Sequence, residues 1–267
     1  MTGPLVVKWG GGTGTDPAAL CADIGELTSA GSRVVLVHGG SAEITVPAEQ
    51  LGRSLRSLVA PDGVVTRYTD ADTLDVITLA LAGRVKPELV TCLGRHGVRA
   101  LGMTGLDAGV VRARRKRTVR TVTDGRVMVV RDDRSGRIET VDAGLLNSLL
   151  DSGLVPVLSP PALAETGDPL NTNADRMAAA AAAALGSRRL VFLTGAPGVV
   201  QAEELLPHYR IPEVLPPWVT GGMAVKLIAA REALTRGVTE VTVSAGGADR
   251  PVRRVLEEQA GTRLALA

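Results

Sequence analysis

Two lysines and one aspartate lie next to glycine-rich turns or at the start of a helix, where proteins commonly bind phosphate. Lys8 ends the apolar run "PLVVK" and is followed by Gly10 and Gly11, and Lys226 follows the glycines of "TGGMAVKL". Asp175 closes the polar run "NTNAD" just before an alanine-rich segment. Glycines after a strand let backbone N–H groups approach an anion, and the next helix adds its positive dipole end. These residue types predict a polyphosphate site, although a solvated charge at a strand end is the plain alternative for Lys8.

A second glycine turn has the same design as the first. In "LVHGGSAE" a strand-like run leads into Gly39, Gly40 and Ser41 and then into a helix-like segment, so two turns could hold one polyphosphate from two sides. Neither turn is a known phosphate loop. A Walker loop places its lysine after the glycines, and a dinucleotide fingerprint starting at Gly10 would need glycine where Thr15 stands.

The elements that would position these residues alternate along the chain. Apolar runs bounded by Gly or Pro, such as "RVVLVHGG" and "RRLVFLTGAPG", predict buried strands, and helical patterns cover residues 16–31, 70–97 and 171–186. This alternation predicts an α/β fold with a mainly parallel sheet and helices on both faces. Residues 107–140 depart from the pattern with a predicted hairpin at Asp124-Gly125. A boundary is expected near residues 159–168, where Pro and Gly concentrate.

Composition excludes several classes of function. The chain has 267 residues, 45% of them hydrophobic and 2% aromatic, and its net charge of +2 argues against a general nucleic-acid binder. Cys21, Cys92 and the three histidines have no metal-ligand spacing. No secretory leader is recognised, and no apolar run reaches the ~18–20 residues that span a bilayer. We therefore expect reduced thiols, no membrane association, no protein-held metal and a cytoplasmic location.

Five motifs follow one another along the chain: Lys8 with Gly10 and Gly11, His38-Gly39-Gly40, Arg67 in "TRYTDADTLD", Asn171 to Asp175, and Lys226 in "GGMAVK". In their order and context they resemble the motifs of the amino acid kinase family. Together they resemble acetylglutamate kinases and their relatives over essentially the whole chain. The resemblance implies a three-layer αβα sandwich of the carbamate kinase type in two lobes. Residues 1–165 would bind the amino-acid substrate and carry the hairpin insert, and residues 166–267 would bind ATP.

The resemblance also implies a reaction and a role for each motif. An ATP- and Mg²⁺-dependent kinase would convert a side-chain carboxylate into an acyl phosphate. Lys8 would stabilise the transferred phosphoryl group, Lys226 the leaving phosphates, and Asp175 would orient both lysines. The implied substrate-binding residues are Gly39, Gly40, Ser41, Arg67 and Asn171, with Arg67 and Asn171 on the α-carboxylate. The implied nucleotide-binding residues are Lys8, Gly10, Gly11, Thr194, Gly195, Gly198, Gly222, Met223 and Lys226; Gly10, Gly11, Gly40 and Ser41 would donate backbone N–H groups.

Three sequence features resemble one branch of this family. "HGGSAE", "VRARRKRTVRT" and "PPAL" are similar to kinases that act on aminoadipate or glutamate attached to a small acidic amino-group carrier protein, in lysine or arginine biosynthesis. The expected carrier-docking residues are Arg112, Arg114, Arg115, Lys116 and Arg117, with Arg120 close by. A solvated face is the plain alternative for this run.

Other readings of the whole chain stay open. "NTNAD" resembles the acetylglutamate branch, so free N-acetylglutamate is the alternative acceptor. A catalytically silent binding protein on the same fold is a third reading, because fold does not determine activity. We expect a homodimer.

Overall fold

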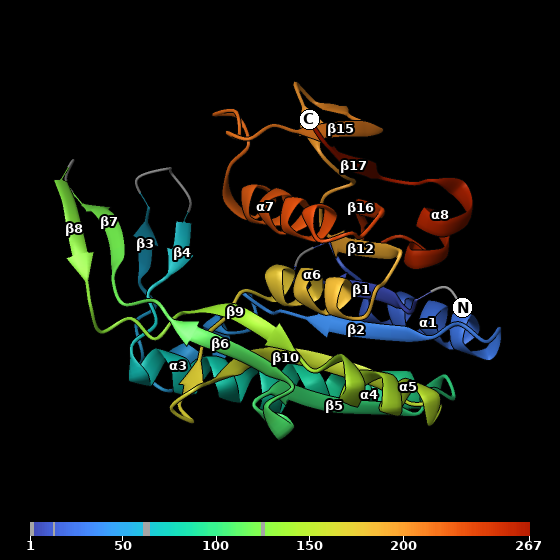
Figure 1. Cartoon of the computed structure of the whole chain (residues 1–267), viewed down its shortest axis with the longest axis horizontal. Helices are drawn as coiled ribbons and strands as arrows, with labels where there is room; N and C mark the ends of the chain where they lie inside the picture. Colours follow the sequence, from blue (N-terminus) through green and yellow to red (C-terminus); the bar gives the residue numbers. More distant parts are fainter. Residues whose placement is uncertain (1–2, 13, 61–64, 124–125) are drawn as a thin grey trace.

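The computed structural model describes residues 3–12, 14–60, 65–123 and 126–267 and has the three-layer α/β architecture expected from the sequence (Figure 1). A central sheet of 11 strands separates two layers of helices. Its innermost strands, β1 (Leu5–Trp9) and β2 (Val34–His38), are buried at every position. Strands covered on both faces need apolar side chains on both faces, which explains their unbroken Val and Leu runs.

The sheet is mainly parallel. The strand order is β15 (His208–Ile211), β17 (Thr262–Leu266), β16 (Glu240–Ala245), β12 (Arg189–Thr194), β1, β2, β10 (Val155–Ala164), β6 (Val111–Arg115) and β9 (Gly136–Val141). Two further strands, β5 (Ala100–Gly105) and β11 (Pro169–Leu170), each pair with β10. Neighbours from β16 through β12, β1, β2 and β10 to β6 are all parallel, whereas β17–β16, β6–β9 and β10–β11 are antiparallel. The carboxyl ends of the central strands therefore meet at one edge of the sheet.

Helices cover both faces of this sheet, each over its own hydrophobic cluster. One layer contains α1 (Pro17–Ser29), α2 (Thr45–Gln50), α3 (Ala71–Thr78), α4 (Lys86–Arg95) and α8 (Pro251–Glu258), and the other contains α5 (Ala143–Asp151), α6 (Ala174–Ala184) and α7 (Gly221–Thr235). In β1, Val6 belongs to the α6–α7 cluster and Val7 to the α1–α4 cluster. Because side chains alternate along a strand, Lys8 points toward α6 and α7.

The predicted helix signals are confirmed. Asp16 caps α1 by accepting a hydrogen bond from Ala18 N at 2.8 Å, and Asn173 caps α6 by accepting one from Arg176 N at 3.1 Å. The alanines of α6 are almost all buried, so small side chains let this helix lie close to the sheet and to α7. Residues 71–95 are helical as expected, with a π-helical segment, Leu79–Val85, between α3 and α4.

Hairpins extend from the sheet at one end of the molecule, where Figure 1 shows two of them standing together. β7 (Val119–Thr123) pairs with β8 (Arg126–Val130) as the sequence predicts, and the predicted turn at residues 124–125 lies outside the described residues. β3 (Ser57–Val59) pairs with β4 (Val65–Arg67), and Val59 N donates to Thr121 Oγ1 of β7 at 3.1 Å. A small third hairpin joins β13 (Val200–Gln201) to β14 (Glu204–Leu205), and a 3₁₀ turn, Asp107–Gly109, precedes β6.

Only part of residues 159–168, where a domain boundary was expected, lies outside the strands. β10 continues through Ala164, so residues 165–168 alone connect it to β11. β12 pairs directly with β1, and one sheet therefore runs through both halves of the chain. The division into lobes at residues 1–165 and 166–267 stays a prediction. In the described part of the chain, no helix is long and apolar enough to cross a membrane.

Candidate active site

Lys8 is a buried lysine at the carboxyl end of the central strand. Its side chain is only 6% exposed, and its Nζ lies 2.9 Å from Asp175 Oδ1. Strand β1 delivers Lys8 to the sheet edge, and the first turn of α6 delivers Asp175 to the same place. Because a buried ammonium is costly unless it is paired, this ion pair satisfies a charge that the fold has taken out of water.

Lys226 completes the cluster from α7. Its Nζ lies 3.4 Å from Asp175 Oδ2, and its side chain is 10% exposed. Helices α6 and α7 pack side by side, which brings Lys226 to the second oxygen of the same carboxylate. Lys8, Asp175 and Lys226 thus form one cluster, with two ammonium groups sharing one carboxylate. With both lysines protonated the cluster has a net charge of +1.

The electrostatics of this cluster favour anion binding. Burial lowers the pKa of Lys8, and Lys226 lowers it further, while Asp175 opposes both effects. Burial alone would raise the pKa of Asp175, but Lys8 and Lys226 outweigh burial and hold it below its usual value. Asp175 therefore stays ionised at neutral pH. An arriving anion would relieve the cost of the second buried cation.

The two predicted glycine turns approach the Lys8 ammonium. A Cβ built on Gly10 or on Gly39 would lie 3.7 Å from Lys8 Nζ. The Gly10 N–H donates to Leu193 O at 2.9 Å, so it is not available as the phosphate donor that the sequence predicted. Among the described residues, the N–H groups of Gly11, Gly40 and Ser41 have no protein acceptor. These three remain the predicted amide donors.

The predicted substrate-binding residues lie beside the second glycine turn. Arg67, at the end of β4, donates to Ser41 O at 3.2 Å, and burial lowers the pKa of its guanidinium. Asn171 Nδ2 donates to Thr69 Oγ1 at 3.0 Å, and Thr69 Oγ1 in turn donates to Arg67 O at 3.2 Å. The fold therefore brings Ser41, Arg67 and Asn171 together, and it does so through Thr69, which the sequence did not single out.

The other predicted nucleotide-binding residues lie at three places. Thr194 and Gly195 lie by the first glycine turn, since a Cβ built on Gly14 would come within 3.1 Å of Gly195 Cα. Gly222, near the start of α7, faces open space, and Met223 is partly buried beside it. Gly198 differs, because a Cβ there would lie 2.4 Å from Thr262 Oγ1. This close contact with Thr262 explains why position 198 is a glycine, and the sequence did not indicate it.

His38 is packed beside the second glycine turn. The ring is fully buried, and His38 Nδ1 lies 3.0 Å from Gly39 O. Burial lowers the pKa of His38 to about 4, and the nearby Lys86 and Lys8 lower it too. A neutral imidazole at physiological pH supports the glycine turn and adds no charge to the site.

The basic run on β6 does not form one continuous face. Arg112 and Arg114 are exposed, but Arg114 forms an ion pair with Glu139, and Arg115 Nε donates to Asp133 O at 3.1 Å. Lys116 is half-buried, and burial and the nearby Arg176 lower its pKa. Arg137 of β9 pairs in register with Arg114 and is exposed as well, and the sequence analysis did not predict this neighbour.

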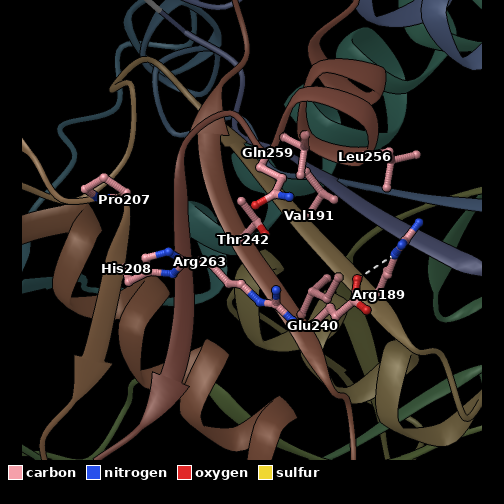
Figure 2. A pocket seen from close by; sticks show the side chains of 11 residues that line it. Arg189, Val191, Pro207, His208, Glu240, Thr242, Leu256, Gln259 and Arg263 are labelled. Carbon is pink, nitrogen blue, oxygen red and sulfur yellow. Dashed lines mark hydrogen bonds and ion pairs between the residues drawn. The ribbon is translucent and has the colours of Figure 1, made fainter.

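A separate small cavity lies away from the lysines. Its volume is about 230 Å³. Figure 2 shows the side chains that line it, among them Arg189, Glu240, Thr242, Gln259 and Arg263. Arg189 and Glu240 are the first residues of β12 and β16, whereas the lysine cluster lies at the carboxyl ends of the strands. Glu240 is already paired with Arg188 and Arg189. This cavity therefore takes no part in the candidate site.

Comparison with known proteins agrees with the geometry. The model of the amino acid kinase family matches residues 3–244. The chain belongs to the amino acid kinase family. It is 38% identical over 261 residues to a protein named LysW-aminoadipate kinase from Thermus thermophilus, covering 94% of this chain and 97% of that one. It is 35% identical over 253 residues to a putative LysW-aminoadipate/LysW-glutamate kinase from Nitrosopumilus maritimus, covering 93% and 94%.

Proteins with other names are similar as well. An acetylglutamate kinase from Acidobacterium capsulatum is 37% identical over 246 residues, covering 89% of each chain. Carbamate kinase from Giardia lamblia superposes with a TM-score of 0.66 at 15% identity, covering 100% of this chain and 99% of that one. N-acetylglutamate synthase from Neisseria gonorrhoeae gives 0.77 at 24% identity, covering 99% and 60%. The two structures share the fold.

Family membership and kinase relatives identify the chain as a phosphotransferase with a carboxyl acceptor. The residues present fit a nucleoside triphosphate, because two buried ammonium groups converge on one carboxylate beside two glycine turns. Within the described ranges, no group of three or more His, Cys, Asp or Glu side chains is arranged to hold a metal ion. A divalent cation at this site would be held through phosphate oxygens, where it offsets their negative charge.

Proposed function

We propose that this protein uses ATP to phosphorylate the side-chain carboxylate of L-2-aminoadipate or L-glutamate attached to a small acidic carrier protein. The products are an acyl phosphate and ADP. The Lys8–Asp175–Lys226 cluster carries the proposal, since phosphoryl transfer between two anions needs buried positive charge held in place. Relatives named LysW-aminoadipate kinase over nearly the full length support the acceptor.

The proposed mechanism relies on electrostatics and needs no general base. A carboxylate with an ordinary pKa of ~4.3 is already ionised at neutral pH. One of its oxygens attacks the γ-phosphorus, and the bond from that phosphorus to the β–γ bridging oxygen breaks, with the electron pair leaving on ADP. Lys8 stabilises the transferred group and Lys226 the leaving phosphates. Asp175 keeps both ammonium groups oriented through the entire step.

The acceptor and nucleotide are proposed to bind on opposite sides of the cluster. Arg67 and Asn171 hold the α-carboxylate of the acceptor, with the planar guanidinium suited to two-point contact. Gly11, Gly40 and Ser41 donate backbone N–H groups. On the nucleotide side, ATP contacts Thr194, Gly195, Gly222 and Met223 in the predicted C-terminal lobe. The predicted cytoplasmic location and homodimer are retained as well.

Free N-acetyl-L-glutamate is the second candidate acceptor. The "NTNAD" motif and the similarity to an acetylglutamate kinase favour it. The decisive experiment traps the acyl phosphate with hydroxylamine after incubation with ATP and either the carrier conjugate or N-acetylglutamate. Hydroxamate formed only from the conjugate supports the proposal. Hydroxamate formed only from N-acetylglutamate would replace it with the second candidate.

A silent binding protein is the third reading, and the same assay tests it. A buried cluster of three charges destabilises the fold, because desolvation of each ion costs several kcal/mol. This cost favours a catalytic role over a silent protein. ADP release in the presence of either acceptor excludes the silent reading. Absence of ADP release with both acceptors would favour it.

The exposed basic surface of β6 and the segment after it is proposed to dock the carrier. Arg112 and Arg117 are exposed and form no ion pair with the described residues. We expect the double change Arg112→Gln/Arg117→Gln to raise KM for the conjugate several-fold and to weaken its salt dependence, because steering by opposite charge is lost. The matched control is Arg210→Gln/Arg236→Gln, which removes the same charge elsewhere. Equal KM changes in both variants would rule out docking at this surface.

A further inference from the structure

The loop that connects β8 to β9 contacts the residues proposed to bind the acceptor (Figure 1). Asp133 of this loop is 2% exposed, and its Oδ2 accepts from Thr69 N at 2.9 Å. Thr69 is fully buried, and its hydroxyl donates to Arg67 O at 3.2 Å and accepts from Asn171 Nδ2 at 3.0 Å. The Asp133 carboxylate therefore holds the residue that joins Arg67 to Asn171.

Backbone hydrogen bonds hold the same loop against both segments. Arg134 N donates to Thr69 O at 2.6 Å, and Asn171 N donates to Arg134 O at 3.0 Å. Gly136 N donates to Asn171 O at 2.8 Å. Residues 133–136 thus connect two parts of the acceptor site that lie 102 positions apart in the sequence.

Both oxygens of the Asp133 carboxylate accept a hydrogen bond. Oδ1 accepts from Ser135 N at 2.8 Å, which closes a turn within the loop, and Oδ2 accepts from Thr69 N, 64 positions earlier in the chain. The turn uses only one oxygen, so an asparagine would close it equally well. An asparagine has a single acceptor oxygen and its NH₂ group donates, so it cannot satisfy both N–H groups. The contact with Thr69 is therefore the one that requires a carboxylate.

The loop is also joined to the basic run that begins on β6. Lys116 N donates to Ser135 O at 3.0 Å, and Arg115 Nε donates to Asp133 O at 3.1 Å. Burial and the nearby Arg176 lower the pKa of the half-buried Lys116, and the Asp133 carboxylate opposes both effects. The loop therefore connects the surface proposed to dock the carrier with the residues proposed to bind the acceptor.

We propose that Asp133 is a positioning residue for acceptor binding. Through Thr69, its carboxylate holds the backbone of Arg67 and the amide of Asn171 where they meet the α-carboxylate of the acceptor. The inference rests on the proposed function, which assigns that carboxylate to Arg67 and Asn171. It applies to either candidate acceptor, because both have a free α-carboxylate. Asp133 touches neither the lysine cluster nor the proposed nucleotide side, so ATP binding does not depend on it.

The first test measures affinity for each substrate separately. Calorimetry on the full-length protein gives Kd for ATP, for the carrier conjugate and for N-acetyl-L-glutamate. We expect Asp133→Asn to weaken binding of the acceptor about tenfold, because one buried N–H loses its partner, and to change Kd for ATP less than about twofold. Steady-state kinetics should show a raised KM for the acceptor with kcat nearly unchanged. An unchanged acceptor Kd, or equal losses for acceptor and ATP, would overturn the proposal.

Asp132→Asn is the matched control. It removes the same charge from the preceding residue, which is exposed and accepts from the Tyr68 hydroxyl, a bond that an asparagine oxygen can keep. The acceptor Kd of this variant should equal that of the parent. Equal weakening in both variants would overturn the role of the Thr69 contact. Urea unfolding of Asp133→Asn completes the comparison, since lower stability with an unchanged acceptor Kd would mean that Asp133 is merely structural.

A double-mutant cycle tests whether Asp133 acts through the acceptor site. We expect Asp133→Asn to weaken acceptor binding less in the Arg67→Gln background than in the parent, because residues that act together are not additive. Fully additive losses would overturn the positioning role and leave the proposed function in place. An unchanged acceptor Kd in Arg67→Gln alone would instead refute the proposed α-carboxylate site, and this inference would fail with it.

Discussion

At the scale of single residues, the decisive feature is an excess of buried positive charge. Lys8 and Lys226 share Asp175, so one of the two cations has no carboxylate of its own. Such an arrangement is unfavourable in the empty protein and favourable when an anion arrives. The folded protein therefore holds this positive charge in place before a phosphate binds. Phosphoryl transfer requires such preorganised charge.

Removing one cation should affect turnover far more than folding. We expect Lys8→Met to lower kcat by ~10²–10³, the usual cost of losing one preorganised electrostatic contact. Lys86→Met is the matched control, because Lys86 is 6% exposed and Lys8 is 5% exposed. Steady-state kinetics and circular dichroism of both variants check this. A similar fall in kcat in the two variants would mean that Lys8 acts only through general packing.

Lys86 itself should make stability depend on pH. Burial lowers the pKa of Lys86 to about 8, against 10.5 for an ordinary lysine, and Asp107 opposes the shift. Between these values the unfolded chain binds more protons than the folded one, so the Lys86 contribution to stability rises with pH. Below about pH 8 the penalty of the buried charge is fully present.

We therefore expect Lys86→Met to be more stable than the parent at pH 7, with the advantage shrinking as pH rises through the window from 8 to 10.5. Urea unfolding at pH 7, 9 and 10 measures the difference, and subtracting the two proteins cancels other titrating groups. A constant difference at all three pH values would contradict this account.

At the scale of elements, the glycines after strands perform different tasks that sequence alone does not separate. Gly10 and Gly39 lie beside the Lys8 ammonium, whereas Gly198 leaves room for Thr262. Thr262 Oγ1 accepts from Val199 N at 2.8 Å and donates to Leu206 O at 2.6 Å. This hydroxyl joins β17 to the residue before β13 and to the residue after β14, and these contacts account for the glycine without a nucleotide.

Gly198→Ala should accordingly lower stability and leave the KM for ATP of the surviving folded enzyme unchanged. The new methyl group would meet a threonine hydroxyl that two hydrogen bonds hold in place, and such overpacking typically costs ~1–3 kcal/mol. Denaturant unfolding and ATP titration check the two halves. Gly222→Ala is the comparison, since nothing lies within 4 Å of a Cβ at that position. A large rise in KM with unchanged stability would instead support the predicted nucleotide role of Gly198.

At the scale of the whole molecule, one buried carboxylate connects the two ends of the chain. Asp23 of α1 accepts from Val252 N at 2.7 Å and from Arg253 N at 2.9 Å, both in the first turn of α8. Arg253 Nε also donates to Asp23 Oδ1 at 2.6 Å. A carboxylate at a helix N-terminus satisfies free backbone donors and interacts well with the dipole.

Loss of this connection should destabilise the entire fold. Asp23→Ala leaves the N–H groups of Val252 and Arg253 without their acceptor, while Arg253 keeps its ion pair with Glu26. We expect a loss of ~1–3 kcal/mol in the free energy of unfolding, the usual cost of leaving a buried donor unsatisfied. Glu26→Gln is the control, because Glu26 also pairs with Arg253 but its side chain is 61% exposed. Urea unfolding of both variants measures the contrast. Equal losses would show that Asp23 has no special role.

The sequence by itself determined the architecture and most of the cluster. Apolar strand runs that alternate with capped helices allow few arrangements other than a parallel sheet covered on both faces. Carboxyl ends of parallel strands meet at one edge, so Lys8 and the second glycine turn could be placed together before the structure was known. The order of five motifs then indicated Asp175 and Lys226 as their partners.

Only the tertiary structure decided which groups touch. Hydrogen bonds and close packing depend on side chains distant along the chain, and local patterns contain no information about such contacts. Thr69 between Arg67 and Asn171, Thr262 against Gly198, and the Gly10 N–H occupied by Leu193 O arise in this way. The contact of Asp133 with Thr69 N is of the same kind, because it joins residues 64 positions apart and exists only after the chain has folded.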